Sequence, residues 1–156
     1  MEKEKLFKKY GIYQDIWSEF YMTRPYIPYI YIESEKKFIH YNNKENDAQI
    51  LIFSNTFNGD ISFIHHFQKI KVIIFGTKFN SSLDYLPESI ELICFPYNSH
   101  FNLTVNNLNL NLKGIIFGKK FNKCTHLLPA GCESISRNTF QHSEEIHNYS
   151  EEIHFT

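Results

Sequence analysis

The feature that most constrains the fold of this chain is a Phe-Asn pair that recurs through its middle. The pair appears four times, at intervals of 22, 22 and 20 residues: Phe57-Asn58, Phe79-Asn80, Phe101-Asn102 and Phe121-Asn122. A segment of twenty-odd residues cannot bury its own apolar face, so copies of it must stack on one another. The repeat therefore predicts a solenoid.

The similarity between units extends well beyond the pair. Residues 70–87 and 112–129 match without a gap, and residues 48–65 follow the same frame. The unit that begins at Ile90 needs two extra residues before its pair, and we expect this insertion to lie in a loop. The unit boundaries are 48–67, 68–89, 90–111 and 112–131, within a repeat domain of residues 47–131.

Each unit begins with the spacing apolar-x-x-apolar-x-Phe, which predicts a short strand because residues two apart lie on one face. Strands stacked in register form a parallel sheet, with Phe on Phe. We expect the paired Asn to satisfy backbone groups in the turns and to bond the Asn above and below it. Gly76 and Gly118 mark two of the turns. The columns expected to point inward are Ala48, Ile70, Ile90 and Leu112; Leu51, Ile73, Ile93 and Ile115; Phe53, Phe75, Phe95 and Phe117; the paired Phe residues; Ile61, Leu83, Val105 and Thr125; and Ile64, Leu86, Leu108 and Leu128.

The pattern L-x-x-L-x-F-G-x-x-F-N-x-x-L-x-x-L-P resembles the FNIP repeat, a relative of leucine-rich repeats, over about residues 48 to 131. The resemblance implies a leucine-rich-repeat-like coil used for protein interaction, in a family found mainly in social amoebae and in giant viruses that infect amoebae. Its members often carry an F-box, which docks a ubiquitin ligase, but residues 1–46 contain no clear F-box. The family's Pro after each pair is also absent, because Asp60, Ser82, Thr104 and Cys124 hold those positions.

The segments on either side of the repeats are predicted to cap the solenoid. Apolar and aromatic residues at helical spacing predict an amphipathic helix over residues 3–22, within an N-terminal capping segment of residues 1–46. This helix closes the first unit or docks a partner, and we favour the first interpretation. The aromatic stretch that follows it predicts extended structure, which we interpret as a diverged first unit. At the other end, Ser134–Phe140 resembles a degenerate fifth unit within residues 132–156.

The C-terminal tail contains a second repeat. The sequence Ser-Glu-Glu-Ile-His occurs at residues 143–147 and again at 150–154. A seven-residue period suits a helix, with Ile146, Tyr149 and Ile153 on one face. A metal site at the tail histidines is disfavoured, because they lie five and seven residues apart whereas ligands on one helix lie three or four apart.

The strand residues that point away from the core are also apolar. Strands that are apolar on both faces are buried on both faces, so something must cover this second face. The candidates are the N-terminal segment, the other side of a flattened coil, a second copy of the chain, or a partner, and we favour internal cover. The possible interaction face consists of Ile52, Ile74, Cys94 and Ile116.

No motif places a base against a nucleophile or builds a phosphate-binding loop, so we expect no enzyme activity and no cofactor or metal. Cys94 is interpreted as a small apolar residue, and the pair His65-His66 as surface histidines. A net charge of −1 argues against a nucleic-acid partner. No apolar run is long enough to cross a membrane or to serve as a signal peptide. We therefore expect an intracellular, cytoplasmic protein with reduced cysteines, in the host cytoplasm if the chain is viral.

These observations favour a mainly β, leucine-rich-repeat-like solenoid of four to five units that serves as a non-catalytic protein-protein interaction module. The partner is unknown, and self-association is possible. The alternative is a substrate-recognition subunit of a ubiquitin ligase with a missing or degenerate F-box. A structural or decaying family member without a partner is a further hypothesis.

Overall fold

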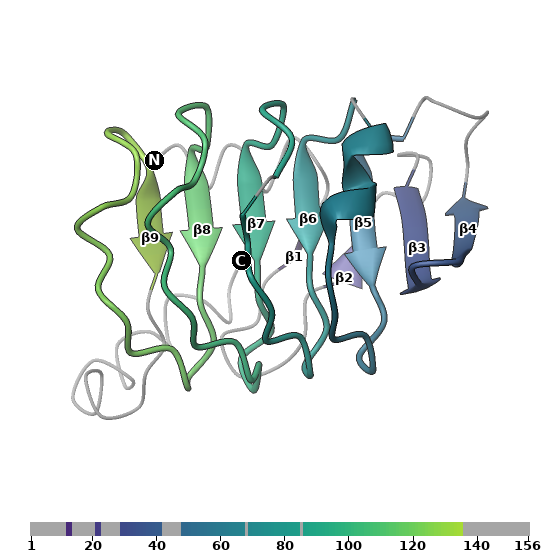
Figure 1. The fold of residues 1–156 in the computed structure, drawn as a ribbon, viewed down its shortest axis with the longest axis horizontal. Coiled ribbons are helices and arrows are strands. Elements are labelled where there is room, and N and C mark those ends of the chain that lie inside the picture. The colour runs from purple at the N-terminus through teal and green to yellow at the C-terminus, as the bar shows by residue number, and fades with distance from the viewer. Residues whose placement is uncertain are drawn as a thin grey trace.

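The computed structural model describes residues 12–13, 21–22, 29–41, 48–67, 69–84 and 86–135. These residues form a mainly β structure, a solenoid of about five turns, as the repeat predicted. One seven-stranded sheet has the order β4-β3-β5-β6-β7-β8-β9, and its strands stand side by side along the solenoid (Figure 1). Their bounds are Tyr29–Ser34 (β3), Lys37–Tyr41 (β4), Ile50–Phe53 (β5), Val72–Ile74 (β6), Leu92–Cys94 (β7), Gly114–Ile116 (β8) and Glu133–Ile135 (β9).

The strands pair in the register that the repeat frame predicts. Along the sheet from β3 through β5, β6, β7 and β8 to β9, each strand runs parallel to the next. Leu51 pairs with Ile73, Ile73 with Ile93, and Ile93 with Ile115. A slip by one residue would turn each inward side chain to the opposite face and would take Phe53, Phe75, Phe95 and Phe117 out of their stack.

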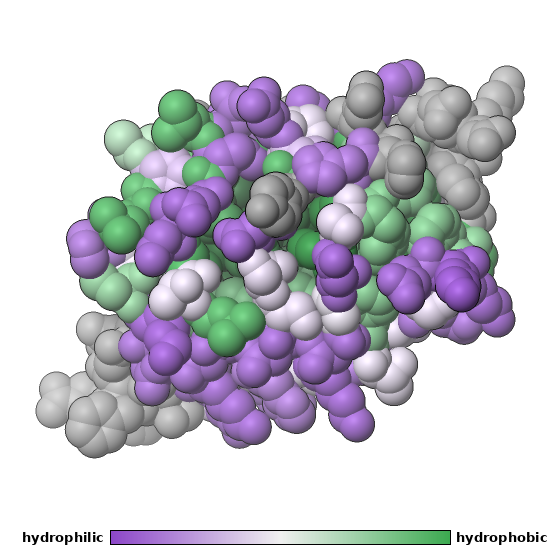
Figure 2. Space-filling view, in the orientation of Figure 1, coloured by the Kyte–Doolittle hydropathy of each residue, from purple (hydrophilic) through white to green (hydrophobic). Residues whose placement is uncertain are grey.

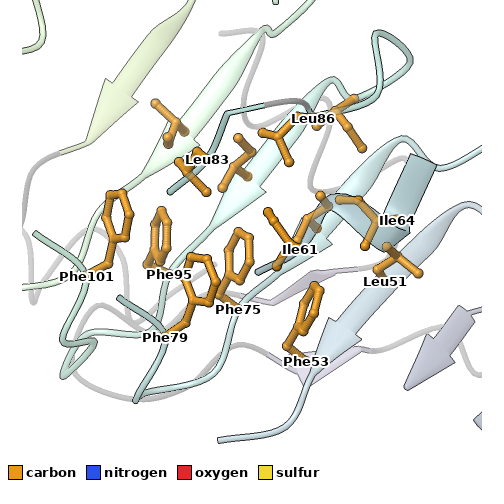
Figure 3. Close-up of a cluster of buried hydrophobic side chains, with 14 of the residues drawn as sticks. Leu51, Phe53, Ile61, Ile64, Phe75, Phe79, Leu83, Leu86, Phe95 and Phe101 are labelled. Atoms are coloured by element: carbon orange, nitrogen blue, oxygen red, sulfur yellow. The ribbon is translucent and has the colours of Figure 1, made fainter. Parts of the chain in front are cut away.

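The core lies between the sheet and the chain segments that return in front of it, and phenylalanine fills its lower part (Figure 3). Rings stack along the solenoid in two columns, and the two rings of each unit also pack on each other. Such pairs contribute beyond their buried area. Centroid distances are 5.1 Å for Phe53–Phe75, 5.0 Å for Phe75–Phe95 and 6.1 Å for Phe95–Phe117 in one column, and 6.4 Å for Phe57–Phe79, 6.1 Å for Phe79–Phe101 and 6.0 Å for Phe101–Phe121 in the other.

The first turn of the solenoid is built from the aromatic stretch before the repeats. Strand β3 pairs with β5 so that Ile30 lies beside Leu51 and Ile32 beside Phe53, which places β3 in the frame of the units. The chain then reverses into β4, which pairs antiparallel with β3 and forms one edge of the sheet. Extended structure was predicted for this stretch, but the hairpin was not.

An aromatic cluster packs at this first end of the phenylalanine columns. Phe38 of β4 stacks on Phe63 at 5.5 Å and meets Phe67 edge-on at 5.5 Å. Phe63 belongs to η1, a 3-10 helix over Ser62–His66, and it also contacts the rings of Phe53 and Phe57 at 6.4 and 6.1 Å. These rings shield the first unit of the core from solvent.

The helix predicted over residues 3–22 is wrong at the four positions that the structure describes there. Ile12–Tyr13 (β1) and Tyr21–Met22 (β2) are strands that pair antiparallel. Isoleucine and tyrosine are residues that favour strands, and this preference competes with the helical spacing on which the prediction rested. The other residues of the predicted helical cap lie outside the described parts of the chain.

A fifth turn of the solenoid begins after the fourth unit. Strand β9 pairs with β8 so that Ser134 lies beside Ile115 and Ile135 beside Ile116. The core thins towards this end, because Thr125 and Leu128 are only half-buried, whereas Ile61 and Ile64 at the same positions of the first unit are fully buried. The rest of the predicted fifth unit and the C-terminal cap, residues 136–156, lie outside the described residues.

Glycine at the corner after a strand lets neighbouring turns approach closely. A Cβ on Gly76 would lie 2.2 Å from the carbonyl oxygen of Ser54, and a Cβ on Gly118 would lie 2.6 Å from that of Pro96. The two-residue insertion of the third unit lies in this same corner, as expected, and carries the buried Ser99, whose hydroxyl accepts the Phe101 N–H at 3.1 Å. Within the described ranges, no helix has the length and apolarity that a membrane span requires.

Candidate interaction surface

The Phe-Asn pair divides its two residues between the core and one edge of the solenoid. The phenylalanines are buried, whereas the asparagines line the edge of the solenoid at which the strands end. The side-chain oxygen of each Asn accepts the backbone N–H of the next: Asn58 from Asn80 at 2.9 Å, Asn80 from Asn102 at 2.9 Å, and Asn102 from Asn122 at 3.0 Å. The predicted ladder is therefore present, with backbone donors in place of amide-to-amide bonds. Its role is architectural.

Side chains stabilise the turns at two of the four positions where the FNIP pattern has proline. Asp60 accepts the Ser62 N–H at 2.8 Å, and Ser82 accepts the Asp84 N–H at 3.0 Å. Cys124 contacts His126, also two residues on, through its thiol. Short polar side chains commonly order turns in this way, so a local hydrogen bond replaces the fixed φ of proline.

Exposed positions on the same edge differ from unit to unit. The residue before each paired Phe is Thr56, Lys78, His100 or Lys120, and all four are exposed. The backbone beneath them is regular, because carbonyl oxygens of Asn55, Thr77 and Tyr97 accept N–H groups from the next turn at 2.7–3.1 Å. A constant backbone thus presents variable side chains.

The second face of the sheet is buried. Ile74, Cys94 and Ile116 of the possible interaction face are at most 5% exposed, and Ile52 is half-buried. They pack in a cluster of their own, separate from the main core. Because this burial exists within a single chain, the chain itself covers these side chains.

The front of the solenoid, opposite the sheet, carries exposed apolar side chains on the third and fourth units. Leu110 is 85% exposed and Leu127 is 53% exposed. Figure 2 shows apolar patches among polar side chains on this face. Sequence reasoning missed both residues, because they fall between the repeat columns. The available signal was leucine at positions where the core frame does not require an apolar residue.

A shallow hollow of about 140 Å³ lies at the corner after β5 and β6. It is lined by Tyr31, Ile52, Phe53, Ser54, Asn55, Ile74, Phe75 and Pro96. Small-molecule sites usually have volumes of roughly 300–1,000 Å³ and a few convergent polar groups. This hollow is smaller, and its lining includes no ionisable side chain except the Tyr31 hydroxyl.

The remaining candidates for chemistry are separate from one another. Cys94 is buried in the sheet as an apolar residue, and Cys124 lies exposed in the turn after the last Phe-Asn pair. His65 is exposed on η1, so the His65-His66 pair lies in a 3-10 helix and not in a strand. Among the described residues, no three His, Cys, Asp or Glu side chains are grouped so as to hold a metal ion.

Comparison with protein-family models and with curated protein sequences finds no match to this chain. The resemblance to FNIP repeats therefore rests on the repeat pattern in the sequence alone.

Proposed function

We propose that this chain is a non-catalytic protein-protein interaction module of the FNIP repeat type. The observation that supports this most strongly is the contrast between a uniform core and a surface that changes along the solenoid. Except at Thr125, the inward columns hold apolar residues in every unit, whereas exposed positions carry Thr, Lys, His, Asn and Leu in turn. Stacked repeats commonly use such extended surfaces to bind partners.

Leu110 and Leu127 mark the part of this surface best suited to a partner. Leucine side chains exposed to this extent gain free energy when a partner removes them from water, roughly 1.5–3 kcal/mol for a fully buried side chain. The ladder asparagines and the stacked phenylalanines are less suited, because they are already engaged within the solenoid. The partner is therefore expected on the third and fourth units.

The test is affinity capture with the full chain from an amoebal lysate, followed by mass spectrometry. The informative variant is L110D/L127D, which places two carboxylates in the apolar surface. The matched control is Q49E/S62D, which adds the same charge at two exposed positions of the first unit. Both variants should keep the wild-type thermal midpoint, because all four side chains are exposed or mostly so.

The proposal expects a protein that wild type and Q49E/S62D capture and that L110D/L127D loses. Recovery of a cullin and its adaptor in this set would favour the ubiquitin-ligase alternative. A captured set that is unchanged by L110D/L127D would contradict the assignment of this surface. Absence of any specific protein would contradict the interaction function itself.

A further inference from the structure

The edge of the solenoid at which the strands end carries basic side chains on its second, third and fourth turns. The turns 76–82, 96–103 and 118–125 contain four lysines and a histidine, and no carboxylate. Lys78, His100, Lys120 and Lys123 are exposed, and Lys119 lies over the Tyr97 ring at 5.3 Å. Within the described parts of the chain, none of these lysines forms a salt bridge.

The opposite edge of the same solenoid has balanced charge. There the residue before each of β6, β7 and β8 alternates in sign through Lys71, Glu91 and Lys113, and β9 begins with Glu133. Lys113 pairs with Glu91 at 3.8 Å. Successive strands of a sheet lie about 4.8 Å apart, so the alternation places opposite charges side by side. The basic edge lacks this compensation, and its lysines lie on the second and fourth turns, about 10 Å apart.

The chain itself contains an acidic segment that begins close to this edge. The parallel strands point towards the basic edge, so the chain leaves β9 on the side where Lys119, Lys120 and Lys123 of the preceding turn lie (Figure 1). Residues 136–156 lie outside the described residues. Their sequence holds Glu144, Glu145, Glu151 and Glu152 in the two copies of Ser-Glu-Glu-Ile-His, and only one Arg and no Lys.

We infer that the acidic C-terminal repeat, residues 143–154, binds the basic edge of the same chain at Lys119, Lys120 and Lys123. Charge complementarity supplies the attraction, and the short connection from Ile135 supplies a high effective concentration. This inference does not depend on the proposed function, which concerns the front face.

The test uses zero-length cross-linking of the full chain with a water-soluble carbodiimide. This reagent activates a carboxylate, and a lysine amine in direct contact then forms an amide while the carbodiimide leaves as its urea. Peptide mapping by mass spectrometry should join the glutamates of 143–154 to Lys119, Lys120 or Lys123. Salt at about 1 M, where the Debye length is about 3 Å, should suppress these cross-links several-fold.

Charge reversal provides the matched comparison. K120E/K123E should reduce the cross-links to the remaining Lys119 by roughly tenfold. K36E/K69E makes the same change in charge at two exposed lysines outside the fourth turn, one in the β3–β4 turn at the first end of the solenoid and one before β6, and it should leave the cross-links unchanged. Adding E151K/E152K to K120E/K123E should restore contact between tail and edge, read as cross-links from the new lysines to the new glutamates.

Three outcomes would overturn the inference. Tail glutamates could cross-link to lysines across the whole surface, or to none. K36E/K69E could reduce the cross-links as much as K120E/K123E does. In a mixture of unlabelled and ¹⁵N-labelled chains, the cross-links could join one chain to the other, which would place the tail on a second copy.

Discussion

Replacing one ring in the middle of the stack, Phe95→Leu, tests whether the columns of phenylalanine stabilise the solenoid as rings. Phe95 is fully buried. Its ring lies 5.0 Å from that of Phe75, 4.4 Å from that of Phe101 and 6.1 Å from that of Phe117, with interplanar angles of 9–13°. Leucine keeps the site apolar and nearly fills it, so the main loss is ring-on-ring contact.

The size of the effect follows from the number of ring pairs lost. An aromatic pair contributes about 0.5–1.5 kcal/mol beyond its buried area. Phe95 makes such pairs with Phe75, Phe101 and Phe117 in the described part of the chain, and their contributions are not fully additive. Phe95→Leu should therefore lower the free energy of unfolding by about 2–3 kcal/mol. Phe95→Ala, which also leaves a cavity, should lower it by about 3–5 kcal/mol.

The assay is urea-induced unfolding followed by circular dichroism, with Ile93→Val as the control. Ile93 is fully buried in β7, two residues before Phe95, and has no aromatic ring. Removing one of its methyl groups should lower the free energy of unfolding by about 0.5–1.5 kcal/mol. All variants should share one slope against urea. If Phe95→Leu costs no more than Ile93→Val, the rings do not stack as the structure shows and the reasoning fails.

Three further substitutions test other parts of the account. Gly76→Ala should lower the thermal midpoint by several degrees, because the new Cβ would lie 2.2 Å from a backbone atom of the neighbouring turn. Gly59→Ala is the control and should leave the midpoint nearly unchanged, because no atom lies within 4 Å of its new Cβ. Equal midpoints for the two variants would contradict the close approach of the turns. The side chain of Asn80 accepts the Asn102 N–H at 2.9 Å. Asn80→Ala should therefore lower the free energy of unfolding in urea by about 1 kcal/mol and speed hydrogen exchange at the Asn102 amide. Unchanged exchange would argue against the ladder. Ile74→Lys should destabilise or aggregate the chain, because its side chain is 5% exposed; a stable folded monomer would show that the second face is open.

The repeated part of the fold could be predicted from the sequence because every unit repeats the same pattern of buried and turn residues. Leu51, Ile73, Ile93 and Ile115 share a column, and their parallel pairing follows from that column alone. The Asn ladder follows from the same periodicity, because a polar residue at a fixed place in every turn must satisfy the same backbone group each time.

The ends of the solenoid were less predictable because their contacts occur only once. Phe38 and Phe63 come from a hairpin and a 3-10 helix that no other unit contains, so no column revealed their stacking. The strands at Ile12–Tyr13 and Tyr21–Met22 compete with a helical spacing of aromatic residues, and single-sequence spacing does not decide between them. The exposure of Leu110 was not predicted, because this residue lies between the repeat columns and the column pattern says nothing about it.

The most direct test of the central claim, that the Phe-Asn repeat is an architectural element of an in-register parallel solenoid, is a side-chain NOE spectrum of the ¹³C,¹⁵N-labelled chain. The account predicts contacts between residues one unit apart, from Leu51 to Ile73, Ile73 to Ile93 and Ile93 to Ile115, together with ring contacts from Phe79 to Phe101. Contacts that instead link these strands in antiparallel order, or that leave the paired phenylalanines exposed to solvent, would contradict it.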